Sequence, residues 1–581
     1  MSSSTVPGST DNQPGGATPG SADPGRARPQ TAIDRIAERW VDTVVDLQPP
    51  IGTYIGRTEV NGRFGDLSPE GTEQYLGAVK QVLAELASTA PADAVDEVTK
   101  TDLTNELELS VMSAEAGLPL RDLNVIDSPS QHIREVFDLM PTASVDDWSV
   151  VATRLAAVEG AVDGYIRTLR EGIRQGITPA RRQVLEVLEQ TRKHAGADNF
   201  FAGFAATAAP AQGELPTSLK ADLERTAESA AAAYGTLAEF LETELAPVAS
   251  SQDAVGRDAY ALHSRRFLGA TIDLDETYEW GIEELGRMVR EQEAIAEEIL
   301  TGASVHEAIA FLDGDDSRKL HGTDALKAWM QATSDRAIAE LGATHFDIPE
   351  EIRALECMIA PTHEGGIYYT GPTDDFSRPG RMWWSVPDGV TEFDTWRELT
   401  TVYHEGVPGH HLQIGQAVYN RGTLNTWRRQ LAGTSGHAEG WALYAERLME
   451  ELGYLDDPAD RLGMLDGQRM RAARVVLDIG VHLQKPRLDG RGVWDAEYAL
   501  DFMRQNVNMD DAFIRFEVNR YLGWPGQAPS YKVGQRIWEQ IRDVYRAREQ
   551  QAFSSKEFHR RALDLGGVGL DTLRSALLAD D

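Results

Sequence analysis

The amino-acid sequence predicts a mainly α-helical protein with one small β insert. Along most of the chain, apolar residues recur at three- and four-residue spacing, which is the period of one helix face. Residues 358–390 instead combine Gly and Pro with paired aromatic residues, a pattern typical of short strands and turns. The sequence has no repeat of fixed period and no sustained heptad pattern, so neither a solenoid nor a coiled coil is expected.

The first 30 residues are predicted to be a disordered tail. They are rich in Ser, Gly, Pro and Thr and cannot bury enough apolar surface to fold. They also lack a basic stretch followed by an apolar one, so no secretory signal is predicted and a cytoplasmic location is expected. Folding should begin at Thr31, because Asp34 suits a variant of the capping box and Ile33 and Ile36 start an apolar helix face.

The remaining elements follow from the same periodicity. Before the β insert, further helices are predicted at about 71–88, 147–175, 179–195, 217–247 and 276–301. After the insert, helices are predicted at 391–416, 434–452, 458–483, 495–505, 510–521 and 530–549. We therefore expect one large domain over residues 31–581, with an N-terminal helical part at 31–340 and the part that carries the chemistry at 341–581.

The composition narrows the possible partners. The chain has 581 residues, with 56 Lys and Arg against 92 Asp and Glu, a formal net charge of −36. Such a balance repels phosphate backbones and anionic lipid, so neither nucleic acid nor a membrane is an expected partner. The single cysteine, Cys357, rules out an intramolecular disulfide and a thiolate-rich zinc site. Any metal must therefore bind to His and carboxylate side chains.

Three histidines fall within eight residues of the chain, at His404, His410 and His411. In the zinc-peptidase motif H-E-x-x-H, two imidazoles four residues apart lie on one helix face and bind a metal, while the Glu polarises a water molecule. Glu405 follows the first histidine here, but the fourth position is Pro408, which cannot bind a metal. The motif is therefore related to H-E-x-x-H but longer.

Two geometries could bring a second imidazole to the metal. In the one we favour, Pro408 and Gly409 form a two-residue bulge that moves His410 into the second ligand position, because proline removes a backbone donor and crowds the preceding turn. In the other, the helix stays straight and His411 returns to the same face, with about 10 Å between the two Cα atoms. An intact helix through Pro408 would be costly.

The third ligand is expected to be Glu439, at the start of a later helix. Its neighbours Ala438 and Gly440 are small and would allow another helix to approach closely. Two His and one Glu leave a fourth position open to water, as in catalytic zinc sites. One Zn²⁺ per chain is therefore predicted.

The segments 404–411 (HEGVPGHH) and 439–444 (EGWALY) resemble the bacterial family of unknown function DUF885, which is grouped with the gluzincin-type zinc metallopeptidases. The resemblance runs from about residue 30 to the C-terminus and includes supporting segments at 368–369, 377–380, 474–482 and 520–532. It implies a single, mainly helical gluzincin-like catalytic domain with a deep substrate groove and a zinc-binding part in 341–581. The family's substrates are largely undefined, so it indicates a reaction class better than a substrate.

The resemblance and the residues together predict hydrolysis of a peptide or other amide bond. Zinc would lower the pKa of a water molecule and polarise the scissile carbonyl. Glu405 would take the proton and deliver it to the leaving amine. Tyr531, in a segment marked by Gly and Pro, is expected to stabilise the oxyanion, as a tyrosine does in similar helical zinc peptidases, and His482 is the reserve candidate.

Several residues are candidates for substrate binding. Arg520 or Lys532 could bind a free carboxylate, which would make the enzyme a carboxypeptidase or dipeptidase. Residues 366–369 could form an edge strand that pairs with an extended peptide, with Tyr369 among the contacts.

Four residues are left with two interpretations each. His411 is either a polar partner beside the site or simply packed. Arg474, Asp478 and His482 lie at helical spacing, so they form either a buried ion network or contacts to substrate, and Asp478 could orient a ligand imidazole.

Two other functions remain open at this point. The same site could hydrolyse an amide in a metabolite that is not a peptide. Alternatively, the protein could be a catalytically inactive helical binding protein. The oligomeric state is not predicted.

Overall fold

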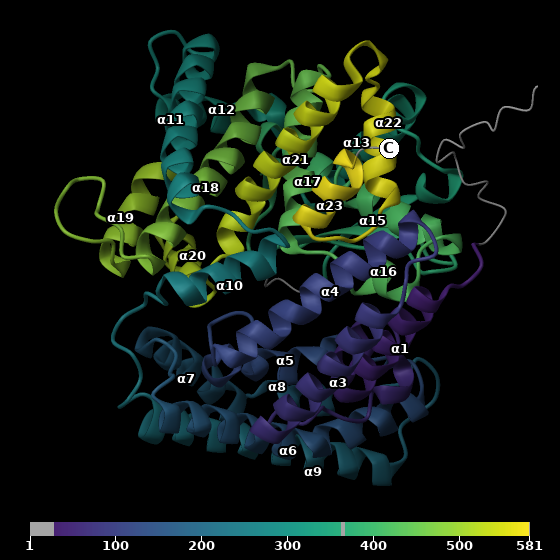
Figure 1. Ribbon diagram of the computed structural model, residues 1–581. Coiled ribbons are helices and arrows are strands. Elements are labelled where there is room, and N and C mark those ends of the chain that lie inside the picture. The colour runs from purple at the N-terminus through teal and green to yellow at the C-terminus, as the bar shows by residue number, and fades with distance from the viewer. Residues whose placement is uncertain (1–27, 362–365, 580–581) are drawn as a thin grey trace, which may run out of the picture.

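The computed structural model describes residues 28–361 and 366–579, and most of them lie in helices (Figure 1). The predicted mainly α fold with a small β insert is confirmed. Residues 1–27 of the predicted tail lie outside the described residues. Arg28, by contrast, already forms ion pairs with Asp34 and Asp93 of the folded part.

The helices of the N-terminal part follow one another closely along the chain. They are α1 (Ala32–Leu47), α2 (Pro49–Tyr54), α3 (Pro69–Ser88), α4 (Ala94–Glu115), α5 (Pro129–Glu135), α6 (Val145–Gln175), α7 (Arg181–Ala195), α8 (Phe200–Ala206), α9 (Thr217–Phe240) and α10 (Arg257–Leu268). The capping box predicted at the start of α1 is present: the Asp34 N–H donates to Thr31 Oγ1 at 3.1 Å, and the Thr31 N–H donates to Asp34 Oδ2 at 3.0 Å.

The second part contains the remaining helices and all of the strands described. The helices are α11 (Leu274–Ile299), α12 (Val305–Asp313), α13 (Thr323–Thr344), α14 (Thr395–Glu405), α15 (His410–Tyr419), α16 (Thr426–Gln430), α17 (Ser435–Glu451), α18 (Pro458–His482), α19 (Ala496–Asn506), α20 (Asp511–Gly523), α21 (Gln527–Glu549), α22 (Ser555–Asp564) and α23 (Leu570–Leu578). The strands are β1 (Lys319–His321), β2 (Leu355–Ile359), β3 (Ile367–Thr370), β4 (Gly380–Trp384) and β5 (Glu392–Asp394).

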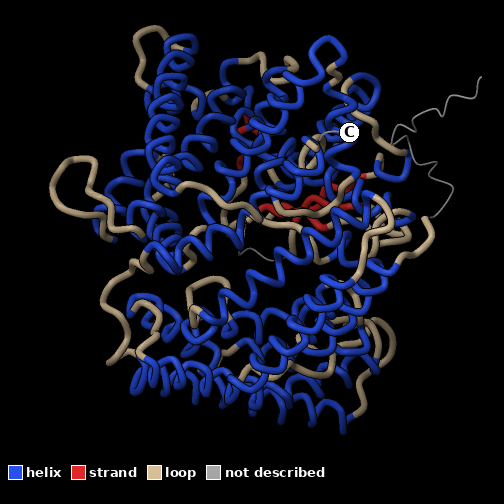
Figure 2. The backbone as a smooth tube through the Cα atoms, in the orientation of Figure 1, coloured by secondary structure: helices blue, strands red, loops and turns tan. Residues whose placement is uncertain are grey.

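The β insert forms two small sheets within the second part (Figure 2). In the larger one, β4 lies between β2, to which it runs parallel, and β3, to which it runs antiparallel. The order confirms that β3 is an edge strand. The paired aromatics stabilise this sheet, since Tyr368 and Trp383 are opposite in register and their rings stack with centroids 6.2 Å apart.

Three apolar cores hold the helices together. One is formed by residues from Leu123 to Ala246, a second by α1 to α4 together with Trp427 of α16, and the largest by residues from Tyr260 to Leu577. The cores therefore separate near residue 250, earlier than the predicted division at residue 340. The physical reason is that α11 and α13, which precede the insert, pack against α18 and the sheet.

Figure 1 shows the two parts as an upper and a lower block, with α4 and α10 where they meet. α10 packs against both α4 and α21 and so connects the blocks. Among the helices described, none has both the length and the apolar character that crossing a bilayer requires.

Candidate metal centre

The helix that carries the first histidine is interrupted where the sequence has Pro and Gly. α14 ends at Glu405 and α15 begins at His410, so four residues lie between the two helices. Within this break the Gly409 N–H donates to the carbonyl of Tyr403, six residues back, instead of four. The break is therefore wider than the predicted two-residue bulge, but it has the predicted effect: His410, and not His411, lies beside His404.

Gly409 is required at this break because the chain passes very close to the preceding turn. A Cβ atom at position 409 would lie 1.8 Å from the carbonyl oxygen of His404. Only glycine allows this approach, which turns the chain so that the rings of His404 and His410 meet edge to face, 4.8 Å apart.

Three side chains converge at this point, as predicted. Glu439 Oε2 lies 3.3 Å from His404 Nε2 and 3.6 Å from His410 Nε2. Glu405 lies close to the same point, since one ligand atom each from Glu405, His404 and His410 lie within 4.8 Å of one another.

The donor atoms fit a tetrahedral zinc ion. Ligands bound at about 2.0–2.1 Å in a tetrahedron lie roughly 3.3 Å apart, close to the separations between Glu439 and the two histidines. Glu439 Oε2 is buried, and like Glu405 Oε2 it has no hydrogen-bond partner in the described part of the chain. Buried carboxylate oxygens are rarely left without a partner, so a cation here would satisfy them.

Glu439 is positioned by close contact between two helices. It lies in the second turn of α17, and a Cβ atom at Gly440 would lie 2.4 Å from the backbone of Gly534 in α21. The small residue predicted to allow a close approach therefore does so. As a result, α17 and α21 pack closely enough to place Glu439 and Tyr531 on the same side of the site.

The electrostatics of the centre favour a positive charge. Burial lowers the pKa of His404, but the carboxylates of Glu439 and Glu446 outweigh it and raise the pKa to about 10. Burial raises the pKa of Glu439, yet its contacts with His404 and His410 hold the pKa well below its usual range. Burial also raises the pKa of Glu405, against the charges of His410 and His404.

Glu446 is a functional residue that the sequence analysis missed. It is buried, and its Oε1 lies 2.7 Å from His404 Nδ1, while its Oε2 accepts a hydrogen bond from Gln468 Nε2 at 3.0 Å. A carboxylate on the far nitrogen of a ligand imidazole fixes the ring's tautomer and orientation. Glu446, and not Asp478, therefore contacts His404, while Asp478 accepts hydrogen bonds from Tyr260 and Gly526.

Tyr531 lies at the centre, but inside α21 instead of in a loop before it. Burial raises its pKa to about 12, with a further contribution from the nearby charge of Glu439, so the phenol keeps its proton at neutral pH. Its side chain is partly accessible, and its hydroxyl makes no hydrogen bond to any residue the structure describes. The group is thus available as a donor.

The predicted carboxylate-binding cations are already paired within the protein. Arg520 and Arg474 both donate to Glu517 Oε2, at 2.9 and 2.8 Å. Lys532 Nζ lies 3.1 Å from Glu284 Oε1. The structure therefore supports the ion-network interpretation of Arg474. Arg520 and Lys532 each already have an anionic partner within the protein.

The other candidates are held by local contacts. His411 is buried, and its Nε2 lies 2.6 Å from the Ile352 carbonyl. Its Nδ1 lies 2.9 Å from the Tyr369 hydroxyl, so the predicted site residues His411 and Tyr369 contact each other. His482 is not brought to the metal centre. It lies fourteen residues, about 21 Å, along α18 from Gln468, and its Nε2 contacts the Tyr521 carbonyl at 3.1 Å.

Arg471 is a second residue that the sequence analysis missed. It lies on α18, one turn after Gln468, and its guanidinium carbon is 5.9 Å from the centre of the Tyr531 ring. Its charge is among the contributions that lower the pKa of Glu446, against the effect of burial.

A cavity of about 1010 Å³ lies elsewhere in the molecule. Helices of the N-terminal part line most of it, together with Arg266 of α10 and Thr434, the cap of α17. None of the predicted site residues is in its lining, so this cavity does not correspond to the expected substrate groove.

Fold and site together define a large helical protein with a buried His-Glu-His cluster and a carboxylate from a second helix. The chain matches the family described as "Bacterial protein of unknown function (DUF885)" over residues 49–577 and belongs to it. None of the curated proteins matches the chain.

Two solved structures share the fold. One is reported as "The crystal structure of the putative lipoprotein from Colwellia psychrerythraea", with a TM-score of 0.83, 21% sequence identity, and coverage of 94% of this chain and 98% of the other. The second is a "putative lipoprotein of unknown function from Shewanella oneidensis", with a TM-score of 0.73, 17% identity, and coverage of 94% and 100%. At these identities the likeness shows the fold alone.

Proposed function

We propose that this protein is a zinc-dependent hydrolase of the gluzincin type that cleaves peptide bonds, with Glu405 as general base. The observation that carries the proposal is the convergence of three donor atoms: Glu439 Oε2 lies 3.3 and 3.6 Å from the Nε2 atoms of His404 and His410 and has no hydrogen-bond partner among the described residues. A cation bound between the two Nε2 atoms and Glu439 Oε2 would satisfy that buried oxygen.

His404, His410 and Glu439 would hold the metal, and Glu446 would orient His404. Zinc in such a site supplies an activated water and polarises the scissile carbonyl. Glu405 would take the proton of the attacking water and pass it to the leaving nitrogen, since its carboxylate lies within 4.8 Å of the ligand atoms of His404 and His410. The Tyr531 hydroxyl donates a hydrogen bond to the oxyanion of the tetrahedral intermediate.

The test combines metal analysis with a single isosteric substitution. Purified protein should contain about one zinc per chain, and it should hydrolyse a peptide library with a rate that falls on chelation and returns with zinc. Glu405→Gln should retain the zinc and lose at least 10²-fold in kcat, because general base catalysis contributes about 10²–10⁴. His404→Ala should lose both the metal and the activity.

Two results would contradict the proposal. Protein without zinc that also fails to bind added zinc would support a binding protein. Zinc-loaded Glu405→Gln with unchanged activity would remove the general base from the mechanism. The cytoplasmic location and a small peptide or amide substrate stay predictions alongside it.

A further inference from the structure

Arg471 differs from the buried Arg474 and Arg520 in being partly exposed and in forming no ion pair with a described residue. Its Nε is buried without a hydrogen-bond partner, and Arg471 forms no hydrogen bond or ion pair with any residue in 28–361 or 366–579. Arg474 and Arg520, by comparison, share Glu517. A partly exposed guanidinium whose Nε is enclosed and without a partner among the described residues is accessible to an anion of a bound molecule.

Arg471 lies close to the proposed reaction centre, so an anion bound to it would lie there too. Gln468, one turn earlier on α18, contacts Glu446, and the Tyr531 ring centre lies 5.9 Å from the Arg471 guanidinium carbon. The Arg471 guanidinium therefore lies beside the ring of the proposed oxyanion donor.

We propose that Arg471 binds the C-terminal carboxylate of a peptide substrate, so that the enzyme releases single amino acids from the C-terminus. This inference rests on the proposed function. Glu405 must pass its proton to the leaving nitrogen, so that nitrogen lies next to Glu405. In a C-terminal residue the carboxylate carbon is only two covalent bonds from that nitrogen and three from the scissile carbonyl carbon, whose oxyanion Tyr531 would bind, so it lies near a cation beside the Tyr531 ring.

A guanidinium suits this task because its parallel N–H groups can donate two hydrogen bonds to one carboxylate. A longer leaving group would place an uncharged peptide carbonyl at the same point and leave Arg471 without an anion. The structure thus assigns to Arg471 the role that the sequence suggested for Arg520 or Lys532.

The experiment compares free-acid and amide forms of the same peptides. The substrates are N-acetylated tripeptides with a varied last residue, each prepared with a C-terminal carboxylate and with a C-terminal amide. Zinc-loaded wild-type protein should cleave the free acids with a kcat/KM at least 10²-fold above that of the amides, since charge-assisted hydrogen bonds are strong. Arg471→Ala should lose most of this preference, mainly through a higher KM for the acids.

Two further variants separate binding from folding. Arg471→Lys keeps the charge but cannot bind in a bidentate manner, so it should retain an intermediate preference. Arg469→Ala, a nearby position on α18 that contacts Gln292 and Asn506, should keep the wild-type preference. Zinc content and melting temperature should be measured for all three variants.

A binding measurement keeps this inference distinct from the proposed function. Calorimetry with analogues whose scissile bond is a reduced CH₂–NH should show the free acid binding at least 10-fold more tightly than the amide to wild type, and equally to Arg471→Ala. Equal cleavage of acids and amides by wild type would overturn the inference and leave the hydrolase standing. Tight, Arg471-dependent binding of the acid without any cleavage would overturn the hydrolase instead. Equal binding of both analogues to wild type would also refute the inference.

Discussion

At the scale of one residue, the Glu446 carboxylate lies 2.7 Å from His404 Nδ1 and would orient the ring of this proposed zinc ligand. Removing such a partner typically costs 10–100-fold in metal affinity. We therefore expect Glu446→Ala to weaken zinc binding by about 10–100-fold in a chelator competition assay. Glu446→Gln, which keeps an acceptor oxygen, should lose less.

A control for this prediction is Glu450→Ala, one turn further along α17. Glu450 pairs with Arg447 at 2.8 Å and does not contact the histidines. Its removal should leave the zinc affinity unchanged. If Glu446→Ala bound zinc as tightly as wild type, the orienting role of Glu446 would be refuted.

Glu517 makes stability depend on pH. Burial raises its pKa, but the charges of Arg474 and Arg520 outweigh it and lower the pKa from 4.5 to about 2. A carboxyl group whose pKa falls on folding contributes stability that is fully present above its unfolded pKa and is lost as the pH falls toward the folded value. For Glu517 that window runs from about pH 5 down to about pH 2.

Glu517→Gln tests this contribution directly. At pH 7 the free energy of unfolding of the variant should be roughly 3 kcal/mol below that of wild type. This value corresponds to the lowering of the Glu517 pKa on folding. The difference should shrink as the pH falls below about 4.5, because wild type then loses its carboxylate charge too. Denaturant titrations at pH 7 and pH 3.5 measure both values, and a difference that does not change between them would contradict the assignment.

Individual site residues were predictable where their spacing along the chain carries the signal. His404, His410 and Glu439 follow from the motif, and Glu446 could have been found because it lies seven residues, or two helical turns, after Glu439 on the same face. The role of Arg471 could not. Whether an arginine has an ion-pair partner depends on which carboxylates reach it in the folded protein. Glu517, for example, pairs with Arg474, more than forty residues away in the sequence.

At the scale of elements, the contact between α17 and α21 sets the position of Glu439. Gly440→Ala would place a methyl group 2.4 Å from the Gly534 backbone, so the two helices would have to separate. We expect a loss of about 1–3 kcal/mol in stability, as for other overpacked sites, together with weaker zinc binding. Thermal unfolding and the chelator assay measure the two effects.

The same substitution in an open position is the control for Gly440→Ala. Gly160 lies in helix α6, and a Cβ there would meet nothing within 4 Å. Gly160→Ala should raise the stability by about 0.5–1 kcal/mol, because alanine is the better helix former. Destabilisation of equal size at both positions would mean that close packing of α17 against α21 is not the cause.

Helices and strands were largely predictable because periodicity and caps act locally. The helix predicted at 458–483, for example, is observed at Pro458–His482. The interruption at 406–409 was predicted only in part, as a bulge. Its width depends on the Gly409 N–H finding the Tyr403 carbonyl and on sheet contacts to α15, which a linear pattern does not encode.

For the whole molecule, the sequence predicted one large helical protein but not where its cores divide. The boundary near residue 250 arises from the packing of α11 on α18, two helices far apart in sequence. Trp427 shows the same difficulty, since it lies in the second part but belongs to the core of α1 to α4. Because a side chain of the second part packs into a core of the N-terminal part, contacts at the junction contribute to the stability of both parts.

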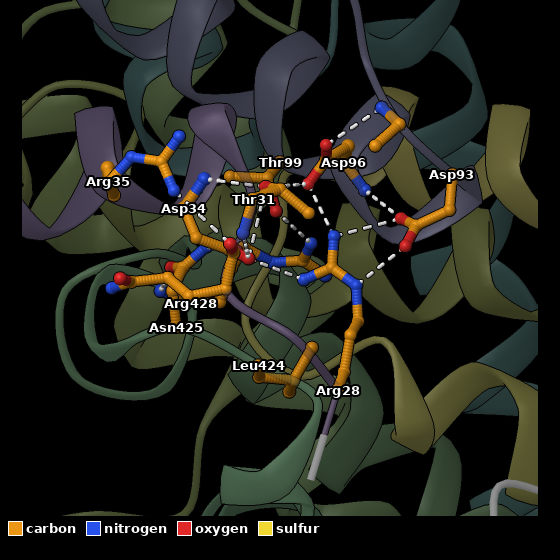
Figure 3. A network of polar contacts seen from close by, with 12 residues as sticks. Arg28, Thr31, Asp34, Arg35, Asp93, Asp96, Thr99, Leu424, Asn425 and Arg428 are labelled. Atoms are coloured by element: carbon orange, nitrogen blue, oxygen red, sulfur yellow. Dashed lines mark hydrogen bonds and ion pairs between the residues drawn. The ribbon is translucent and has the colours of Figure 1, made fainter.

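Arg28 fastens this junction (Figure 3). Its side chain bonds to Asp34 of α1 at 2.7 Å, to Asp93 at 2.7 Å and to the buried Asp96 of α4, and its backbone N–H donates to the Gly422 carbonyl near α16 at 2.7 Å. Asp34 in turn accepts a hydrogen bond from Asn425 of the second part.

Arg28→Ala would leave the carboxylates of Asp34 and Asp96 buried without their cation. Exposed pairs contribute about 0–1 kcal/mol and breaking a buried pair costs about 3–5, so we expect this partly exposed network to lose roughly 2–3 kcal/mol. Limited proteolysis should then cut the N-terminal part first, while zinc stays bound. Arg35→Ala, at an exposed position of α1 whose side chain reaches only the Gln30 carbonyl, should change the stability by less than about 0.5 kcal/mol. Equal effects of the two substitutions would show that the ion pairs of the Arg28 side chain with Asp34, Asp93 and Asp96 do not stabilise the N-terminal part.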